Sequence, residues 1–201
     1  MDALRISPKY TSRDWHKLDS NNPDHWKIAA AIVKDRLDGR FLRFASNCLR
    51  AKFSGFVVLS IDSLLAETIQ QFQEGITNGH GQSKKLITTF LKGKRFQPDF
   101  DGEARTAFYT DIRCGLLHQA EAKEMWLIKR NQPSLLQYVA HGKGYIIDVE
   151  RFHCAVRASL NDYLGLILRE SSTGLRSNLW GKMDHICNVR EQRGVLYGVE
   201  E

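Results

Sequence analysis

The sequence predicts a mainly α-helical protein, a bundle of about five to six helices with a small β-hairpin inserted before the penultimate helix. Two observations carry this prediction. Apolar residues recur at three- and four-residue steps through several long stretches, which is the period of a helix with one buried face. Between two groups of such stretches, residues 124–149 hold three short runs rich in strand-forming residues.

The composition fits one ordinary globular domain: the chain has 201 residues, of which 42% are hydrophobic and 26% charged. The four cysteines are scattered and form no Cys-x-x-Cys pair, which argues against a zinc knuckle or a disulfide framework. We therefore expect a reducing, cytoplasmic compartment, no metal ion and no cofactor. The N-terminus lacks a secretory pattern and the apolar runs are too short to span a bilayer, so we expect no membrane contact.

We expect a single domain over residues 1–201. The polar stretch 1–23 contains Pro8 and Pro23 and is predicted to be an irregular arm. The remaining segments are a helical bundle over 24–123, a small β excursion over 124–149, C-terminal helices over 150–190 and a tail over 191–201.

A long first helix is predicted to start at the N-cap Asp24 and to carry an arginine ridge beside its apolar face. The ridge consists of Arg36, Arg40, Arg43 and Arg50, spaced i, i+4, i+7 and i+14 within a narrow arc. Residues 1–100 hold 16 Lys+Arg and 10 Asp+Glu, so they carry the whole net charge of +6. The ridge is either a solvated helix flank or a phosphate-binding rim for RNA.

The stretch from Gly55 to Phe72 is apolar nearly all round at its start, which is typical of the central helix of a bundle. Glu67 lies on its polar face, whereas Asp62 lies among Leu and Ile. Burying a carboxylate without a partner is costly, so we expect Asp62 to have one. That partner is either a core arginine or helix cap, or an active-site group.

Later elements follow from the same periodicities. Ser83 is expected to cap a short helix, and a further helix is predicted from about Glu103 to Lys123. Short strands are predicted over residues 125–129, 135–140 and 144–148, the last two joined by a turn at 141–144. Helices are then expected over about 152–171 and 177–189.

The helix from Glu103 to Lys123 holds the residues that point most directly to chemistry. Arg113 and His118 are five positions apart, which on an α-helix separates them by about 140°. They cannot form a dyad within one helix, so cooperation requires a second copy across a two-fold axis or a long reach by the arginine. A histidine can exchange protons near neutral pH and an arginine can neutralise a phosphate, a combination that suffices for RNA cleavage by the 2′-hydroxyl.

Three further polar side chains surround this pair on the same helix. Asp111 is expected to project close to the direction of His118, Tyr109 lies one turn before Arg113, and Cys114 lies one turn before His118. Gly115 would allow close approach to the central helix. By spacing alone, a surface salt bridge or a packed core group is the favoured explanation of an arginine and a histidine on one helix.

The run Arg113-Cys-Gly-Leu-Leu-His118 resembles the signature of the HEPN superfamily (higher eukaryotes and prokaryotes nucleotide-binding domain), an arginine and a histidine separated by four to six residues. Residues 54–68 and 108–121 also look like a group of bacterial HEPN-like proteins. The likeness covers about residues 24–170. One departure is Cys114, because many active members have Asn, Asp or His after the arginine.

The resemblance implies a HEPN-like bundle whose motif helices face each other in a homodimer and form a metal-independent endoribonuclease site. Arg113 and His118 would be catalytic, with Asp111 or Asp62 orienting one of them. Tyr109, Cys114 and Glu67 would support them. Such proteins act as toxins, in phage defence or in RNA processing, and an antitoxin or regulatory protein is then an expected partner. Two alternatives are a non-catalytic nucleotide- or protein-binding dimer module and a DNA-associated accessory protein.

Overall fold

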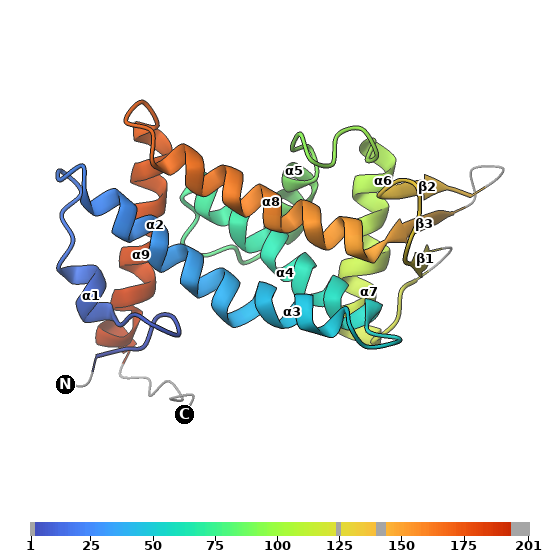
Figure 1. The fold of residues 1–201 in the computed structure, drawn as a ribbon, viewed down its shortest axis with the longest axis horizontal. Helices are drawn as coiled ribbons and strands as arrows, with labels where there is room; N and C mark the ends of the chain where they lie inside the picture. The colour runs from blue at the N-terminus through green and yellow to red at the C-terminus, as the bar shows by residue number, and fades with distance from the viewer. Residues whose placement is uncertain (1–2, 124–125, 140–143, 194–201) are drawn as a thin grey trace. The chain divides into compact units, whose positions relative to one another are not determined.

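A computed structural model of the chain describes residues 3–123, 126–139 and 144–193, and it has the predicted mainly helical architecture with a small sheet (Figure 1). The elements are α1 (Ser12–His16), α2 (His25–Leu37), α3 (Arg43–Cys48), α4 (Gly55–Glu74), α5 (Ser83–Phe90), α6 (Gly102–Ala107), α7 (Cys114–Gln119), β1 (Trp126–Lys129), β2 (Leu136–Tyr138), β3 (Tyr145–Asp148), α8 (Val149–Ile167) and α9 (Thr173–Arg193), with π-helical turns η1 (Asp38–Leu42) and η2 (Phe108–Arg113). No helix within the described ranges is long and apolar enough to cross a membrane.

The chain divides into two compact units. Unit 1 comprises Met1–Arg40, Gln71–Gly79 and Asp162–Glu201, and unit 2 comprises Phe41–Gln70 and His80–Asn161. Helices α4 and α8 therefore each contribute residues to both units. The helix that carries Arg113 and His118, here called the motif helix, consists of α6, η2 and α7. The motif helix and the sheet belong to unit 2.

In unit 1, arginines of the first helix bind the N-terminal segment. Arg36 donates a hydrogen bond to the carbonyl of Ile6 (2.6 Å), and Arg40 donates one to the carbonyl of Arg5 (2.8 Å). The segment predicted as an irregular arm contains the short helix α1, in which the buried Trp15 donates to Asp184 of α9 (2.7 Å). These contacts join residues 5–15 to α2, η1 and α9.

Lys182 is the most deeply buried lysine among the described side chains of unit 1. Its ammonium group donates to the side chain of Gln71 (2.7 Å) and to the carbonyls of Ile76 (2.8 Å) and Thr77 (3.1 Å). Burial, together with the nearby charge of Arg36, lowers the pKa of Lys182 to about 8 from its usual 10.5. Between these two values the unfolded chain binds more protons than the folded one, so stability rises with pH.

We expect the pH dependence caused by Lys182 to appear when the free energy of unfolding of the wild-type protein is compared with that of Lys182→Met. The free energy of unfolding of the wild type, relative to that of the variant, should rise by about 1–2 kcal/mol between pH 8 and 10.5, because partial solvent access weakens the full pKa effect. Urea titrations across this pH range measure it. A difference that stays constant with pH would contradict the lowered pKa.

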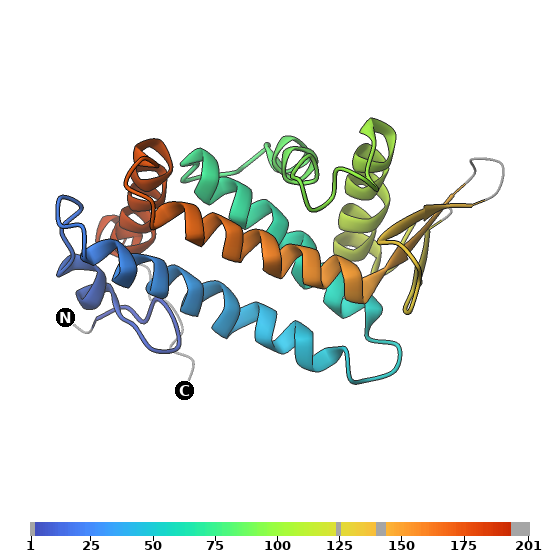
Figure 2. The same cartoon turned by 45° about the horizontal axis from the view of Figure 1, so that its top comes forward.

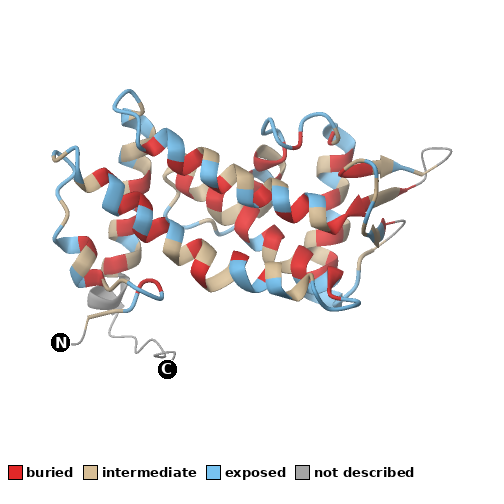
Figure 3. Cartoon of the chain, in the orientation of Figure 1, coloured by how far each residue is buried: buried red, intermediate tan, exposed pale blue. Residues whose placement is uncertain are grey.

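The core of unit 2 is a cluster of aromatic rings that joins the motif helix to α8. Phe108 of η2 stacks on Phe152 of α8 with 5.0 Å between ring centroids, and Phe96 and Phe100 contact the same ring. All four are buried. Buried residues, in red, recur along α8 and along the helix beside the sheet (Figure 3). The cluster therefore fixes the start of the motif helix against α8.

The helix predicted from Glu103 to Lys123 is divided into α6, η2 and α7, which follow one another closely beside the sheet (Figure 2). Asp101 caps α6 by accepting a hydrogen bond from the amide of Ala104 (2.8 Å). The helix ends at Gln119, four residues before the predicted limit of Lys123, and the next residue, Ala120, has a left-handed φ of 54°. A side chain at Gly115 would meet the carbonyl of Glu121, so the close approach at this glycine is to the returning chain and not to α4 as predicted.

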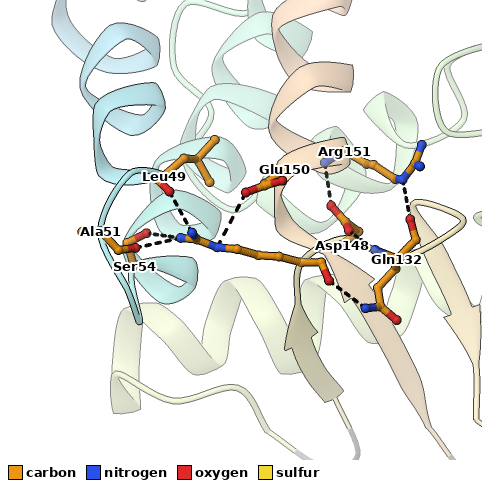
Figure 4. Close-up of polar contacts among 8 residues, drawn as sticks. Leu49, Ala51, Ser54, Gln132, Asp148, Glu150 and Arg151 are labelled. Atoms are coloured by element: carbon orange, nitrogen blue, oxygen red, sulfur yellow. Dashed lines mark hydrogen bonds and ion pairs between the residues drawn. The ribbon is translucent and has the colours of Figure 1, made fainter.

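The sheet has the order β1-β3-β2. β2 and β3 form the predicted antiparallel hairpin, whereas β1 runs parallel to β3, a pairing that the sequence pattern did not reveal. The predicted strand residues Met125 and Ala140 and the turn at 141–143 lie outside the described residues. Arg130, which follows β1, donates to the carbonyls of Leu49 and Ala51 and so ties the sheet to the loop before α4 (Figure 4).

Candidate functional site

Arg113 lies where α4, α5 and the motif helix meet. Its guanidinium donates to the Glu67 carboxylate of α4 (3.1 Å) and to the Ser83 hydroxyl of α5 (3.3 Å). Ser83 in turn donates to the other carboxylate oxygen of Glu67 (2.8 Å). The Arg113 and Glu67 side chains are 20% and 14% exposed, so this triangle of charged and polar groups reaches the surface but is mostly desolvated.

Ser83 had been expected to cap α5, but it is the first residue of that helix and its hydroxyl binds Glu67 instead. The difference has a physical cause. A hydroxyl at a helix start gains about 1 kcal/mol from a neutral backbone donor, whereas a hydrogen bond to a charged carboxylate is stronger. Ser83 therefore belongs to the site, and its pairing with a residue sixteen positions earlier could not be read from local spacing.

A π-helical turn changes which side chains gather around Arg113. The Cys114 amide donates to the Tyr109 carbonyl, five residues earlier, and the Tyr109 hydroxyl also forms a hydrogen bond with the Cys114 thiol. Burial, reinforced by this thiol, raises the pKa of Tyr109 above its ordinary value. The Arg113 guanidinium lies 5.9 Å from the centroid of the Tyr109 ring. Tyr109 therefore stays a neutral phenol that packs against the arginine.

His118 is separate from this cluster. It lies in the last turn of α7 and is exposed, and the described residues include no hydrogen-bond partner for its ring. Asp111, which had been expected to project toward it, accepts from the indole of Trp126 (3.3 Å) and from Thr110 (2.9 Å) instead. The chain thus brings Glu67, Tyr109 and Cys114 to Arg113, and it leaves His118 open to solvent.

Asp62 has the partner that its burial required, and this partner is His153 of α8. The carboxylate is fully buried, and its Oδ1 lies 2.9 Å from His153 Nδ1. Burial raises the pKa of Asp62, and the hydrogen bond with His153 opposes the rise. Oδ2 has no hydrogen-bond partner among the described residues. Asp62 therefore stands apart from the Arg113 cluster.

His153 continues the chain of hydrogen bonds to Ser46 of α3, with 2.8 Å between Nε2 and the hydroxyl. Asp, His and Ser in this order suggest a nucleophilic serine, so the hydrogens must be placed. The Ser46 hydroxyl also contacts the Leu42 carbonyl (2.8 Å), which only accepts, and Arg157 (3.1 Å), which only donates.

One assignment uses all of these contacts: Ser46 donates to Leu42 and accepts from both Arg157 and His153. His153 Nε2 then carries a hydrogen and cannot take one from Ser46. A serine nucleophile needs the opposite arrangement, so we interpret this network as a structural tie between α3, α4 and α8. Its sequence signal was the isolated Asp62; nothing in the pattern identified His153 or Ser46.

The arginine ridge does not remain one continuous feature. Arg36 and Arg40 lie in unit 1 and bind backbone carbonyls, whereas Arg43 and Arg50 lie in unit 2 and are exposed. The π-helical turn η1 follows Arg36 and contains Arg40, and it breaks the α-helical spacing on which the ridge prediction depends. Of the four ridge arginines, only Arg43 and Arg50 have exposed side chains.

Comparisons with protein-family models, with curated proteins and with solved structures find no match to this chain. Among the described residues, no group of three or more His, Cys, Asp or Glu side chains is arranged to hold a metal ion.

Proposed function

We propose that this protein is a metal-independent endoribonuclease of HEPN type whose site is completed in a homodimer. The observation that carries the proposal is the way in which the structure holds Arg113 and exposes His118. Arg113 is held at the surface by Glu67 and Ser83, and His118, one and a half turns later, is exposed and available for proton transfer. These are the two groups that cleavage of a phosphodiester requires.

The reaction is a transesterification within the RNA. The 2′-hydroxyl attacks the adjacent phosphorus, the bond from phosphorus to the 5′-oxygen breaks, and a 2′,3′-cyclic phosphate and a 5′-hydroxyl are formed. In the proposed site His118 of one subunit takes the proton of the 2′-hydroxyl, and the leaving oxygen receives a proton from solvent. Arg113 of the other subunit neutralises the charge that develops on the phosphorane.

Exposed leucines beside the site support a symmetric partner. Leu64 lies one turn before Glu67 on α4 and is 46% exposed, and Leu117 lies one turn after Arg113 on α7 and is 55% exposed. Apolar side chains around a half-buried charged pair are typical of a surface that a second protein covers. Because about 140° separates Arg113 from His118, a second copy on this face would also bring each arginine near a histidine.

The proposal is tested by incubating the purified protein with a mixture of RNAs in EDTA. We expect cleavage, and products that carry 2′,3′-cyclic phosphate and 5′-hydroxyl ends. Absence of cleavage would contradict the proposal, and so would products with 3′-hydroxyl and 5′-phosphate ends, because attack by water leaves those. A role as a toxin or phage-defence effector, controlled by an antitoxin or regulatory protein, is part of the same proposal.

Glu67→Gln should lower cleavage without unfolding the protein. Glutamine keeps the shape and the hydrogen bond to Ser83, but it removes the charge that fixes the Arg113 guanidinium. We expect kcat to fall by about tenfold or more, because small displacements of a charge-stabilising group are costly, while KM changes little. Steady-state cleavage of one defined RNA measures both. An unchanged kcat would show that Glu67 does not position Arg113.

The second candidate is a non-catalytic nucleotide- or protein-binding dimer, and the Arg113–Glu67 ion pair favours it. An arginine whose side chain is 20% exposed and ion-paired with a carboxylate can serve only to hold helices together. In that case His118→Ala would weaken dimerisation without affecting any RNA cleavage. Sedimentation showing an intact variant dimer argues against this candidate.

A further inference from the structure

The loop between α3 and α4 presents the most exposed large apolar side chain among the described residues. We call residues 49–54 the stapled loop. Phe53 within it is 95% exposed, and its φ of 61° lies in the left-handed region that residues with a Cβ atom avoid. Neither the exposure nor the backbone conformation stabilises the fold. Strained residues that persist at a surface often serve binding.

The stapled loop is held in one conformation by Arg130. Its guanidinium donates to the carbonyls of Leu49 (2.8 Å) and Ala51 (2.9 Å) and to the Ser54 hydroxyl (2.8 Å), as the dashed lines to these three residues show (Figure 4). On the other side, a side chain at Gly55 would collide with Ile128 of β1, so the loop end lies directly on the sheet. Phe53 is thus presented on a fixed support and loses little freedom when it binds a partner.

The residues next to Phe53 in the sequence are basic. Arg50 and Lys52 flank it and are exposed, and residues 49–61 contain no aspartate or glutamate. Phe56, in the first turn of α4, is also exposed. Exposed aromatic rings among cations are the combination that binds single-stranded nucleic acid, because bases stack on the rings while the cations contact phosphates. On a face shared by two copies, Arg50 and Lys52 would meet like charges, which disfavours self-association there.

We propose that the stapled loop is a base-stacking site for an unpaired stretch of the RNA that is bound at Arg113 and His118. This rests on the proposed ribonuclease function and adds the substrate class, single-stranded RNA. Gly55 and Glu67 are twelve residues apart on α4, which corresponds to about 18 Å. At about 3.4 Å per stacked nucleotide, the base on Phe53 is about five nucleotides from the phosphate at Arg113.

Binding is measured by fluorescence anisotropy with a labelled twelve-nucleotide oligoadenylate, in a His118→Ala background that leaves the RNA intact. Phe53→Ala should weaken binding about tenfold, as expected for the loss of one stacked base. Phe53→Trp should retain affinity, and its added fluorescence should be quenched by the single strand but not by a duplex of equal length. Leu168→Ala, which removes another exposed apolar side chain, in unit 1, is the matched control and should bind normally.

Cleavage separates this inference from the function on which it rests. In the active protein, Phe53→Ala should raise KM for the twelve-nucleotide substrate about tenfold and leave cleavage of a trinucleotide unchanged, because the short substrate does not reach the loop. Wild-type cleavage with no effect of Phe53→Ala would overturn the stacking site alone. Loss of the dimer by Phe53→Ala in sedimentation would also overturn it, since the loop would then be a subunit interface. A wild type that neither binds nor cleaves RNA would overturn the ribonuclease proposal itself.

Discussion

Arg113→Ala is expected to lower kcat for RNA cleavage by about a hundredfold to a thousandfold, and His118→Ala by a similar factor. Removing one preorganised donor from a developing oxyanion costs this much in other enzymes, and loss of a general acid or base costs as much. The RNA 2′-hydroxyl is a weak nucleophile, so a water molecule in the place of either side chain would not restore the rate. Single-turnover cleavage of a defined RNA in EDTA measures both variants.

The control for these variants is Gln119→Ala, which removes the exposed neighbour of His118 on α7. It should cleave at the wild-type rate. Circular dichroism should show all three variants folded, because His118 is exposed and Arg113 contacts only groups that reach the surface. Equal cleavage by the wild type, Arg113→Ala and His118→Ala would mean that the motif is not catalytic.

Asp62→Ala should lower the free energy of unfolding by about 3–5 kcal/mol. The substitution leaves His153 buried without its hydrogen-bond partner, and removing one member of a buried polar pair is strongly destabilising. Urea denaturation followed by circular dichroism measures the loss. For a chain of marginal stability this is a large fraction of the total.

The double variant Asp62→Leu/His153→Leu distinguishes two contributions to the loss of stability. One is the cost of leaving a buried polar group unpaired, and the other is the stabilisation that the Asp62–His153 contact provides. Replacing both partners by apolar residues should cost clearly less than Asp62→Ala alone, because no buried polar group is then left unpaired, and Ser46 keeps its bonds to Leu42 and Arg157. Additive losses from the two positions would show that Asp62 and His153 do not act as a pair.

Much of the fold could be predicted because it depends on local periodicity. The three- and four-residue recurrence of apolar residues indicated the long helices, and the β-branched and aromatic runs indicated strands that the structure contains at β1, β2 and β3. The π-helical turns η1 and η2 could not be predicted, since they add a residue to a turn without a sequence signature. They are the reason why the ridge arginines and the pairing of the Cys114 amide with the Tyr109 carbonyl differ from α-helical expectation.

The site was predictable only where residues lie close in sequence. Arg113, His118 and the polar neighbours of Arg113 on its own helix were identified by spacing, and Asp62 was identified because a carboxylate stood among apolar residues. Ser83 and His153 were missed because their contacts depend on how α5 and α8 pack against α4, at separations of sixteen and ninety-one residues. Tertiary packing of this kind leaves no periodic trace in the chain.

The most direct test of the central claim is complementation between two inactive variants. Heterodimers of Arg113→Ala and His118→Ala, purified through two different tags, hold one composite site with an intact arginine from one subunit and an intact histidine from the other. The proposed dimeric site predicts that they cleave RNA in EDTA at about half the wild-type rate per dimer. A rate no higher than that of either inactive homodimer, alongside an active wild type, would contradict it.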